Sequence, residues 1–167
     1  MKRLLNILLA MAVLMPLAGC DSLDDDRVMG TCRIDLSIIG TWSIYGVNSV
    51  GDYKYFVKEK RIPSNFAYTA TTYTGNGGVL LIGTTGNGTG GIVPAAYEMA
   101  CPYCRKHSTL ITMDASTLEA YCPECSSRFN VLLGSGQPIS GPAYNKRYSL
   151  HRYRCTPSAN GGYLITN

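Results

Sequence analysis

The sequence has few of the residues on which enzymatic sites usually depend. It contains two histidines in 167 residues, and only 16% of its residues are charged. It has no Gly-x-Ser-x-Gly and no His-Glu-x-x-His pattern, and its carboxylates are too dispersed to nominate a general acid and a general base. We therefore expect no hydrolytic or group-transfer site and name no catalytic residue.

Basic side chains are not concentrated in any region of the sequence. The chain has 15 lysines and arginines against 11 acidic residues, and the basic residues form no stripe interleaved with aromatics. A surface that follows a phosphate backbone needs such a stripe. We therefore expect no nucleic-acid partner.

Sustained helical periodicity is also missing, and no stretch carries a capped apolar stripe of period 3.6. Short apolar or alternating runs recur instead, separated by turns in a chain with 18 glycines and 12 tyrosines. This pattern predicts an all-β fold, a small antiparallel barrel or sandwich. The expected strands cover residues 32–39, 53–57, 66–73, 79–82, 92–99, 109–113, 129–132, 148–153 and 163–165.

The first 19 residues have the pattern of a secretory signal peptide. Lys2 and Arg3 supply the positive start, and the apolar stretch over 4–17 is too short to span a bilayer comfortably. Residues 17–20, Leu-Ala-Gly-Cys, resemble a bacterial lipobox, and this resemblance implies cleavage before Cys20 and lipidation of Cys20. The membrane would then be a partner through the lipid anchor. The alternative is an ordinary cleaved signal with a chance cysteine.

Residues 20–29 form the lipidated cysteine and an acidic tether. The run over 21–26 contains four aspartates, and its charge favours a solvated, disordered spacer. It also resembles the acidic tag of surface-exported lipoproteins of Bacteroides-like bacteria. That resemblance implies the bacterial cell envelope and the outer membrane, with the domain facing outward; a plain spacer is the alternative. Residues 30–167, roughly 140 in number, suffice for one domain with a core.

Two cysteine pairs are the strongest chemical signal in the chain. Cys101 and Cys104 are separated by two residues, as are Cys122 and Cys125, and seventeen residues lie between the pairs. A turn of this length brings two sulfurs to one point, so two such turns complete a tetrahedral metal site. The four cysteines are therefore the predicted metal ligands.

Cys32 and Cys155 are left over once these four residues and Cys20 are assigned. Both fall in expected strands near the ends of the domain, and the compartment is oxidising. We expect terminal strands lying side by side and a disulfide between the two residues. The alternative is two buried free thiols.

The region around the second cysteine pair resembles the cluster-binding half of a Rieske domain. The residues that carry the resemblance are 121–130 (Tyr-Cys-Pro-Glu-Cys-Ser-Ser-Arg-Phe-Asn), the glycine hairpin 134–138, the Gly-Pro-Ala loop 141–143 and the strand 150–153 (Leu-His-Arg-Tyr). Residues 96–102 are similar to the strand entering the first cluster loop. The resemblance covers roughly residues 92–166. It implies a Rieske-like lipoprotein of Bacteroides-like bacteria with a two-loop, rubredoxin-like metal-binding subdomain at about 96–143.

The ligand positions depart from this family pattern. A Rieske cluster needs two histidines on one iron, whereas here Cys125 occupies the second histidine position and Tyr103 follows Cys101 where the first would stand. His107 is a possible substitute ligand, while His151 lies in a later strand. We therefore do not expect a standard Rieske centre.

Several metal states and functions are compatible with the four cysteines. The first is a single Zn or Fe ion, which suits two such turns. The second is an all-cysteine [2Fe-2S] cluster, which would preserve electron transfer to an unknown redox partner protein. The third is a metal-free state with disulfides or free thiols. Cys101-Pro102-Tyr103-Cys104 is identical to the glutaredoxin motif, which makes a thiol-disulfide oxidoreductase another alternative, although the run after it is β-like rather than helical. A surface binding module is the last alternative. We expect a structural metal site.

Overall fold

The computed structural model describes residues 30–85 and 91–167. The predictions for the signal peptide, for lipidation of Cys20 and for the acidic tether concern residues outside these ranges. Within them, no helix combines the length and the apolar character needed to cross a bilayer.

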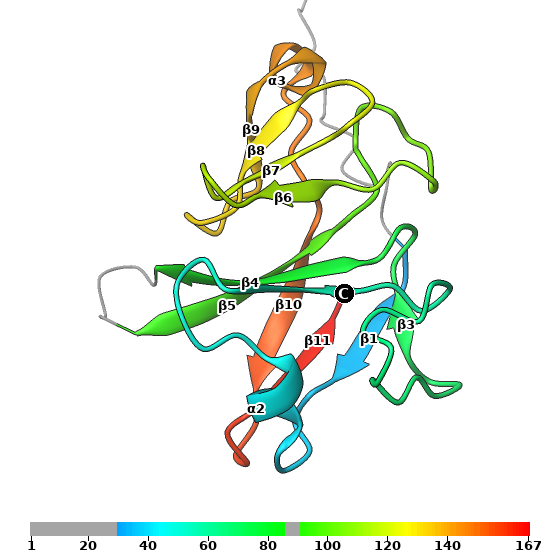
Figure 1. Cartoon of the computed structure of the whole chain (residues 1–167), viewed down its shortest axis with the longest axis vertical. Helices are drawn as coiled ribbons and strands as arrows, with labels where there is room; N and C mark the ends of the chain where they lie inside the picture. The colour runs from blue at the N-terminus through cyan, green and yellow to red at the C-terminus, as the bar shows by residue number, and fades with distance from the viewer. Residues whose placement is uncertain (1–29, 86–90) are drawn as a thin grey trace, which may run out of the picture.

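A seven-stranded antiparallel sheet forms the base of the molecule (Figure 1). Its strand order is β2-β4-β5-β10-β11-β1-β3, and the sheet curls into a nearly closed barrel. The strands are β1 (Cys32–Asp35), β2 (Tyr53–Phe56), β3 (Tyr73–Thr74), β4 (Val79–Thr85), β5 (Ile92–Glu98), β10 (Arg152–Pro157) and β11 (Tyr163–Thr166). The N-terminal and C-terminal strands pair with each other, because β1 runs along β11.

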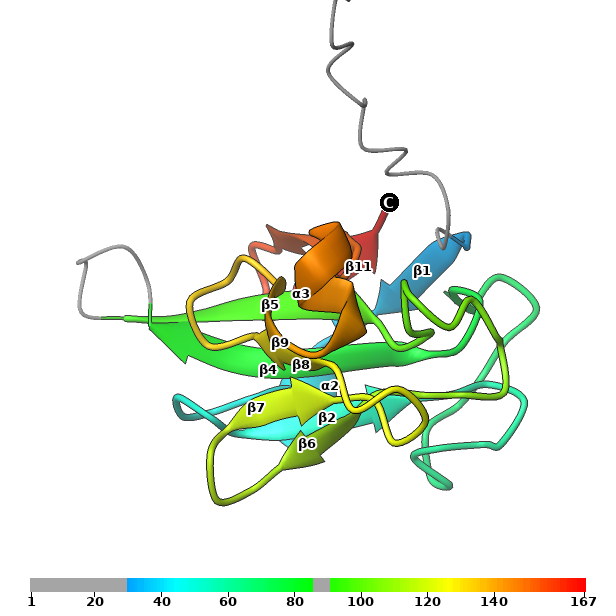
Figure 2. The ribbon, with the colours of Figure 1, turned by 90° about the horizontal axis from the view of Figure 1, so that it is seen from above.

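A four-stranded antiparallel sheet lies at one end of this barrel, together with helix α3 (Figures 1 and 2). It contains β6 (Thr112–Asp114), β7 (Glu119–Tyr121), β8 (Arg128–Asn130) and β9 (Gln137–Ser140), followed by α3 (Pro142–Lys146). Strands β5 and β10 connect the two sheets, since the chain leaves the barrel after β5 and returns to it through β10. The four-stranded layer and α3 thus occupy residues 112–146 as one insertion between β5 and β10.

Two apolar clusters fill the molecule, one inside the barrel and one between the barrel and the four-stranded sheet. Strand β4 serves both: Val79 and Leu81 face the first cluster, and Leu80 and Ile82 face the second. Successive side chains of a strand point to opposite faces, so a continuous apolar run is required where both faces are covered. The second cluster also contains two of the metal-site cysteines.

The predicted all-β class is confirmed, and most of the expected strands form. The expected strand at 66–73 is wrong, because only Tyr73 of that run is in a strand; the preceding aromatics pack as a loop, with Phe66 against Phe56, Tyr45 and Tyr68. Two five-residue helices, α2 (Thr41–Tyr45) and α3, were not expected. Helices this short have too few turns to show an apolar periodicity.

The predicted disulfide between Cys32 and Cys155 is wrong, because both residues are free thiols. Strand β11 lies between their strands: Cys155 is opposite Ile165, which in turn is opposite Ile34. Two strand spacings amount to about 10 Å, well beyond the Cα separation of about 6 Å that a disulfide spans. Burial raises the pKa of Cys155 to about 11 and also raises the pKa of Cys32. The alternative of two free cysteines therefore holds, with Cys32 buried and Cys155 only partly buried.

Candidate metal site

Two turns of the same geometry present the four cysteines. The first follows β5, and the second connects β7 to β8. In each turn the N–H of the residue four positions after the first cysteine donates to that cysteine's carbonyl, from Arg105 to Cys101 and from Ser126 to Cys122, both at 2.9 Å. Arg105 and Ser126 both have a left-handed backbone, with φ of 54° and 57°. The Cys-Pro-x-Cys sequence therefore folds into the same loop twice.

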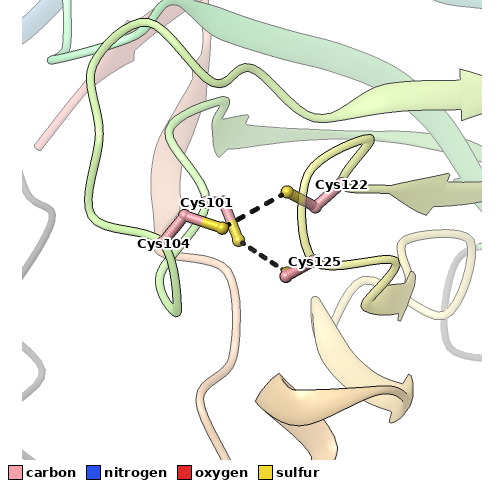
Figure 3. A group of neighbouring side chains, drawn as sticks. All are labelled: Cys101, Cys104, Cys122 and Cys125. Atoms are coloured by element: carbon pink, nitrogen blue, oxygen red, sulfur yellow. Dashed lines mark hydrogen bonds between the residues drawn. The ribbon is translucent and has the colours of Figure 1, made fainter.

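The four sulfurs converge on one point (Figure 3). The Sγ atoms of Cys101 and Cys125 are 3.7 Å apart, as are those of Cys104 and Cys122, and all four lie within 4.8 Å of one another. Both short distances join one loop to the other. Metal–sulfur bonds of about 2.3 Å in a regular tetrahedron place the sulfurs about 3.8 Å apart, so the donor set fits one tetrahedral ion.

The two sulfurs of each loop differ in burial. Cys101 and Cys122 are fully buried in the cluster between the sheets, whereas Cys104 and Cys125 are half-buried. Each loop thus contributes one inner and one outer sulfur. A metal held here would be enclosed by protein on the barrel side and lie close to the surface on the other.

Ser127 supports the second loop from beneath. Its buried Oγ accepts the N–H of Ala143 at 3.0 Å and lies 3.2 Å from the Sγ of Cys125. The Cys125 thiol donates to this oxygen; once the sulfur is a thiolate, the hydroxyl hydrogen of Ser127 can point at it instead. Burial raises the pKa of the Cys125 thiol, but the hydrogen bonds from Ser127, together with those from Cys104 and Cys122, outweigh it and hold that pKa below its ordinary value.

The Gly-Pro-Ala loop places Ala143 where Ser127 can reach it. Gly141 has a φ of 78°, and a Cβ at this position would lie 2.7 Å from the Cα of Ser127. Only glycine allows this approach without displacing the backbone. Helix α3 therefore packs directly against the second cysteine turn, which explains why this loop and that turn occur together in the sequence.

The first loop holds thiols in a less polar setting. Burial raises the pKa of Cys101 although the N–H groups of Tyr103 and Cys104 donate to its sulfur, and burial likewise raises the pKa of Cys104 to about 12. Metal ligation requires the thiolate, so binding of a cation must release these protons. A divalent ion at the centre would supply the positive charge that the four clustered sulfurs, two of them buried and two half-buried, otherwise lack.

Side chains also connect the two loops at the surface. Glu124, inside the second cysteine turn, pairs with Lys106 and accepts the hydroxyl of Thr109 at 2.6 Å. Thr109 in turn accepts the N–H of Cys101 through its backbone carbonyl, at 3.4 Å. Exposed ion pairs of this kind contribute little to stability, but they fix the relative register of the two turns.

Glu98 anchors the first loop to the barrel. Its fully buried carboxylate accepts four hydrogen bonds, from the N–H groups of Asn76, Gly77 and Ala100 at 2.7–2.9 Å and from the hydroxyl of Tyr153 at 2.7 Å. Ala100 immediately precedes the first ligand, Cys101. One side chain therefore joins the turn after β3, the strand β10 and the entry to the metal site.

The structure brings together the four predicted cysteines and leaves out the other candidate ligand. His107 is exposed on the first loop and is not part of the sulfur group. Sequence reasoning gave no role to Ser127 or Glu98. Ser127 belongs to the Rieske-like turn at residues 121–130, and Glu98 is the one charged residue of the expected apolar strand 92–99. Both features could have indicated a structural role.

Replacing Ser127 with alanine is expected to weaken metal binding by about 10- to 100-fold, the usual effect of losing a hydrogen-bond partner of a ligand. The change removes the hydroxyl that is hydrogen-bonded to Cys125 and that would donate to its metal-bound thiolate, and it leaves the N–H of Ala143 unpaired. Competition with a chromophoric chelator measures the affinity. The exposed Ser135 offers the matched control, and an S127A protein with the affinity of S135A would contradict the role assigned to Ser127.

No protein-family model matches this chain, and a search of curated proteins finds no match either.

Proposed function

We propose that this chain is a lipid-anchored protein of the bacterial envelope whose Rieske-like domain binds one metal ion through Cys101, Cys104, Cys122 and Cys125. The ion, Zn or Fe, holds the two turns together and has a structural role. The observation that carries this proposal is the convergence of four sulfurs from two loops on one centre. The Rieske-like assignment rests on the sequence motifs alone.

The pattern of short sulfur contacts favours one ion over a two-iron cluster. In the family pattern, Cys101 and Cys122 take the positions that share one iron, and Cys125 takes a position on the other. A [2Fe-2S] cluster would separate sulfurs on different irons by the width of the cluster. The 3.7 Å contact between Cys101 and Cys125 instead joins two such positions, as expected for a single tetrahedron.

A closed set of four thiolates suits a structural metal site better than a catalytic one. Catalytic zinc keeps an open position for water or substrate, and four protein ligands leave none. The two turns belong to different parts of the chain, so the ion fixes the entry to the four-stranded sheet against its central hairpin. Zn in this site would stabilise the subdomain in the way that it stabilises other small metal-bound folds.

Electron transfer is the second candidate, and the half-buried sulfurs of Cys104 and Cys125 favour it. Iron bound there would lie close to the surface, where a redox partner protein can approach. Iron in a tetrahedral set of four sulfurs is a known alternative to zinc. The protein would then be an electron carrier.

Thiol-disulfide exchange is a weaker candidate. Cys101 would be the attacking thiol of its motif, yet it is fully buried, burial raises its pKa, and no helix begins at it. Reactive cysteines require the opposite, an accessible thiol with a lowered pKa. A surface binding module is not favoured by any particular cluster, since the exposed tyrosines of the described residues lie on three different elements: Tyr73 on β3, Tyr103 on the first cysteine loop and Tyr144 on α3.

Elemental analysis of protein purified anaerobically from its native host tests the proposal. We expect one Zn or one Fe per chain and no acid-labile sulfide. Fe with an equal amount of sulfide would replace the single ion by a cluster and select the electron carrier. A chain without metal, in which each cysteine pair has closed into a disulfide, would overturn the proposal.

A further inference from the structure

Strands β5 and β10 pair only over a short length, and Figure 1 shows them running apart beyond it. Their last pair is Ala96 opposite Tyr153. Beyond it, β5 continues along β4 to Ile92, and β10 continues along β11 to Pro157. Pro94 lies two residues past Ala96 on the same edge, and it has no N–H to extend the ladder towards β10. The proline explains why the barrel opens here.

A hollow of about 520 Å³ occupies the space between the diverging strands. Val93 and Pro94 from β5 line one side, Arg152 and Arg154 from β10 line the other, and Tyr163 from β11 contributes a ring. No acidic side chain lines it. The hollow thus combines apolar walls with a small number of cationic groups, the composition typical of small-molecule sites.

The two arginines lack acidic partners in the part of the chain that the structure describes. The ion pairs formed by residues 30–85 and 91–167 involve Lys54, Lys106 and Arg128, and neither Arg152 nor Arg154. Arg152 and Arg154 are exposed and alternate along β10, so both project from the same face of the strand. Their positive charges therefore reinforce each other at the hollow.

Arg33 extends this positive surface. It lies opposite Thr166 of β11, and Thr166 lies opposite Arg154 of β10, so the three residues form one row across three strands. Arg33 is also exposed; Asp35, two residues along β1, interacts with its charge, but the two form no ion pair within contact distance. Guanidinium groups bind carboxylate and phosphate oxygens in a two-pronged geometry, which is the ligand chemistry that this row of arginines suits.

We infer that the hollow between β5 and β10 binds a small organic anion. Arg152 and Arg154 hold its carboxylate or phosphate group, and its apolar body rests against Val93, Pro94 and Tyr163. The site is separate from the four cysteines, and its occupation requires no change at the metal centre. It gives a function to Arg152 of the Leu-His-Arg-Tyr strand, which the metal site does not use.

Phenyl phosphate, benzoate and inorganic phosphate are suitable probes in an NMR titration of the isotope-labelled, metal-loaded protein at low salt. We expect saturable shifts confined to residues 92–96, 151–157 and 163–167. Comparison of the affinities for phenyl phosphate and benzoate shows whether the site prefers a phosphate or a carboxylate group. Inorganic phosphate has no apolar body, so we expect it to bind at least about tenfold more weakly than phenyl phosphate. Shifts that do not saturate, or that spread over the whole surface, would refute the site.

Charge variants separate a built site from general electrostatic attraction. Replacing Arg154 with glutamine is expected to weaken binding of the preferred probe by about tenfold or more, since a hydrogen-bonded charge pair is lost. R154K keeps the charge but loses the planar guanidinium group, so its affinity for the probe should fall between those of the unmodified protein and R154Q. Lys60 is exposed in another loop, so K60Q removes the same charge elsewhere; an equal loss in K60Q and R154Q would overturn the inference. The metal content of R154Q should equal that of the unmodified protein, so the two proposals can fail independently.

Discussion

Replacing Cys101 with serine is expected to reduce the metal content from one ion per chain to a small fraction of that. Structural zinc binds with about 10–16 kcal/mol, so the loss of one of four sulfurs costs about 3 kcal/mol or more, at least about 100-fold in affinity. The serine hydroxyl stays protonated at neutral pH and is a poor ligand for a thiophilic ion. Elemental analysis and chelator competition measure both quantities.

The remaining cysteines provide the matched controls. Cys155 is a partly buried free thiol outside the sulfur group, so C155S removes one thiol and should keep the metal. C104S should lose metal as C101S does, because both sulfurs are corners of the same tetrahedron. A C101S protein that binds metal as tightly as C155S would show that the four sulfurs do not act together.

Loss of the metal is expected to loosen one half of the molecule before the other. Cys101 and Cys122 belong to the apolar cluster between the two sheets, whereas the cluster inside the barrel contains neither. Hydrogen exchange of C101S should therefore show lost protection in β6–β9 and retained protection in β1, β10 and β11. Uniform loss over both sheets would mean that the ion stabilises the domain as a whole and that the two layers unfold together.

The sequence was sufficient to predict the donor set, because Cys-x-x-Cys turns are local. The spacing of Cys101 from Cys104, and of Cys122 from Cys125, determines each loop with little help from the rest of the chain. That the two loops face each other depends on β5, β7 and β8, of which the sequence pattern predicted strands at β5 and β8 but none at β7. The all-β class and the four candidate ligands followed from patterns within a few residues.

Long-range pairing was harder to predict. The expected disulfide assumed that the strands of Cys32 and Cys155 are neighbours, but β11 lies between them. Strand order depends on contacts across the whole chain, which residue spacing does not report. Glu98 is a similar case: its partners Asn76 and Tyr153 lie more than twenty residues away on either side, so its role emerges only when the strands are assembled.

Replacing Glu98 with alanine is expected to destabilise the protein by about 4 kcal/mol or more. The carboxylate is fully buried and accepts four hydrogen bonds, three of them from backbone N–H groups. Each buried donor left without a partner costs about 1–3 kcal/mol, and the removed side chain also leaves a cavity. Equilibrium unfolding in denaturant of the metal-loaded protein measures the change.

Variants of the same cluster distinguish the hydrogen bonds from the lost volume. Glu98→Gln preserves the shape but turns one oxygen into an N–H₂ group facing donors, so we expect it to cost about 2 kcal/mol. Tyr153→Phe removes one donor and leaves the three N–H bonds, and the double variant should cost less than the two single changes together, because the residues share a hydrogen bond. Exposed Glu59 is the control: Glu59→Ala should change stability by no more than about 0.5 kcal/mol. If Glu98→Ala were as mild as Glu59→Ala, Glu98 would not be the residue that joins the metal loop to the barrel.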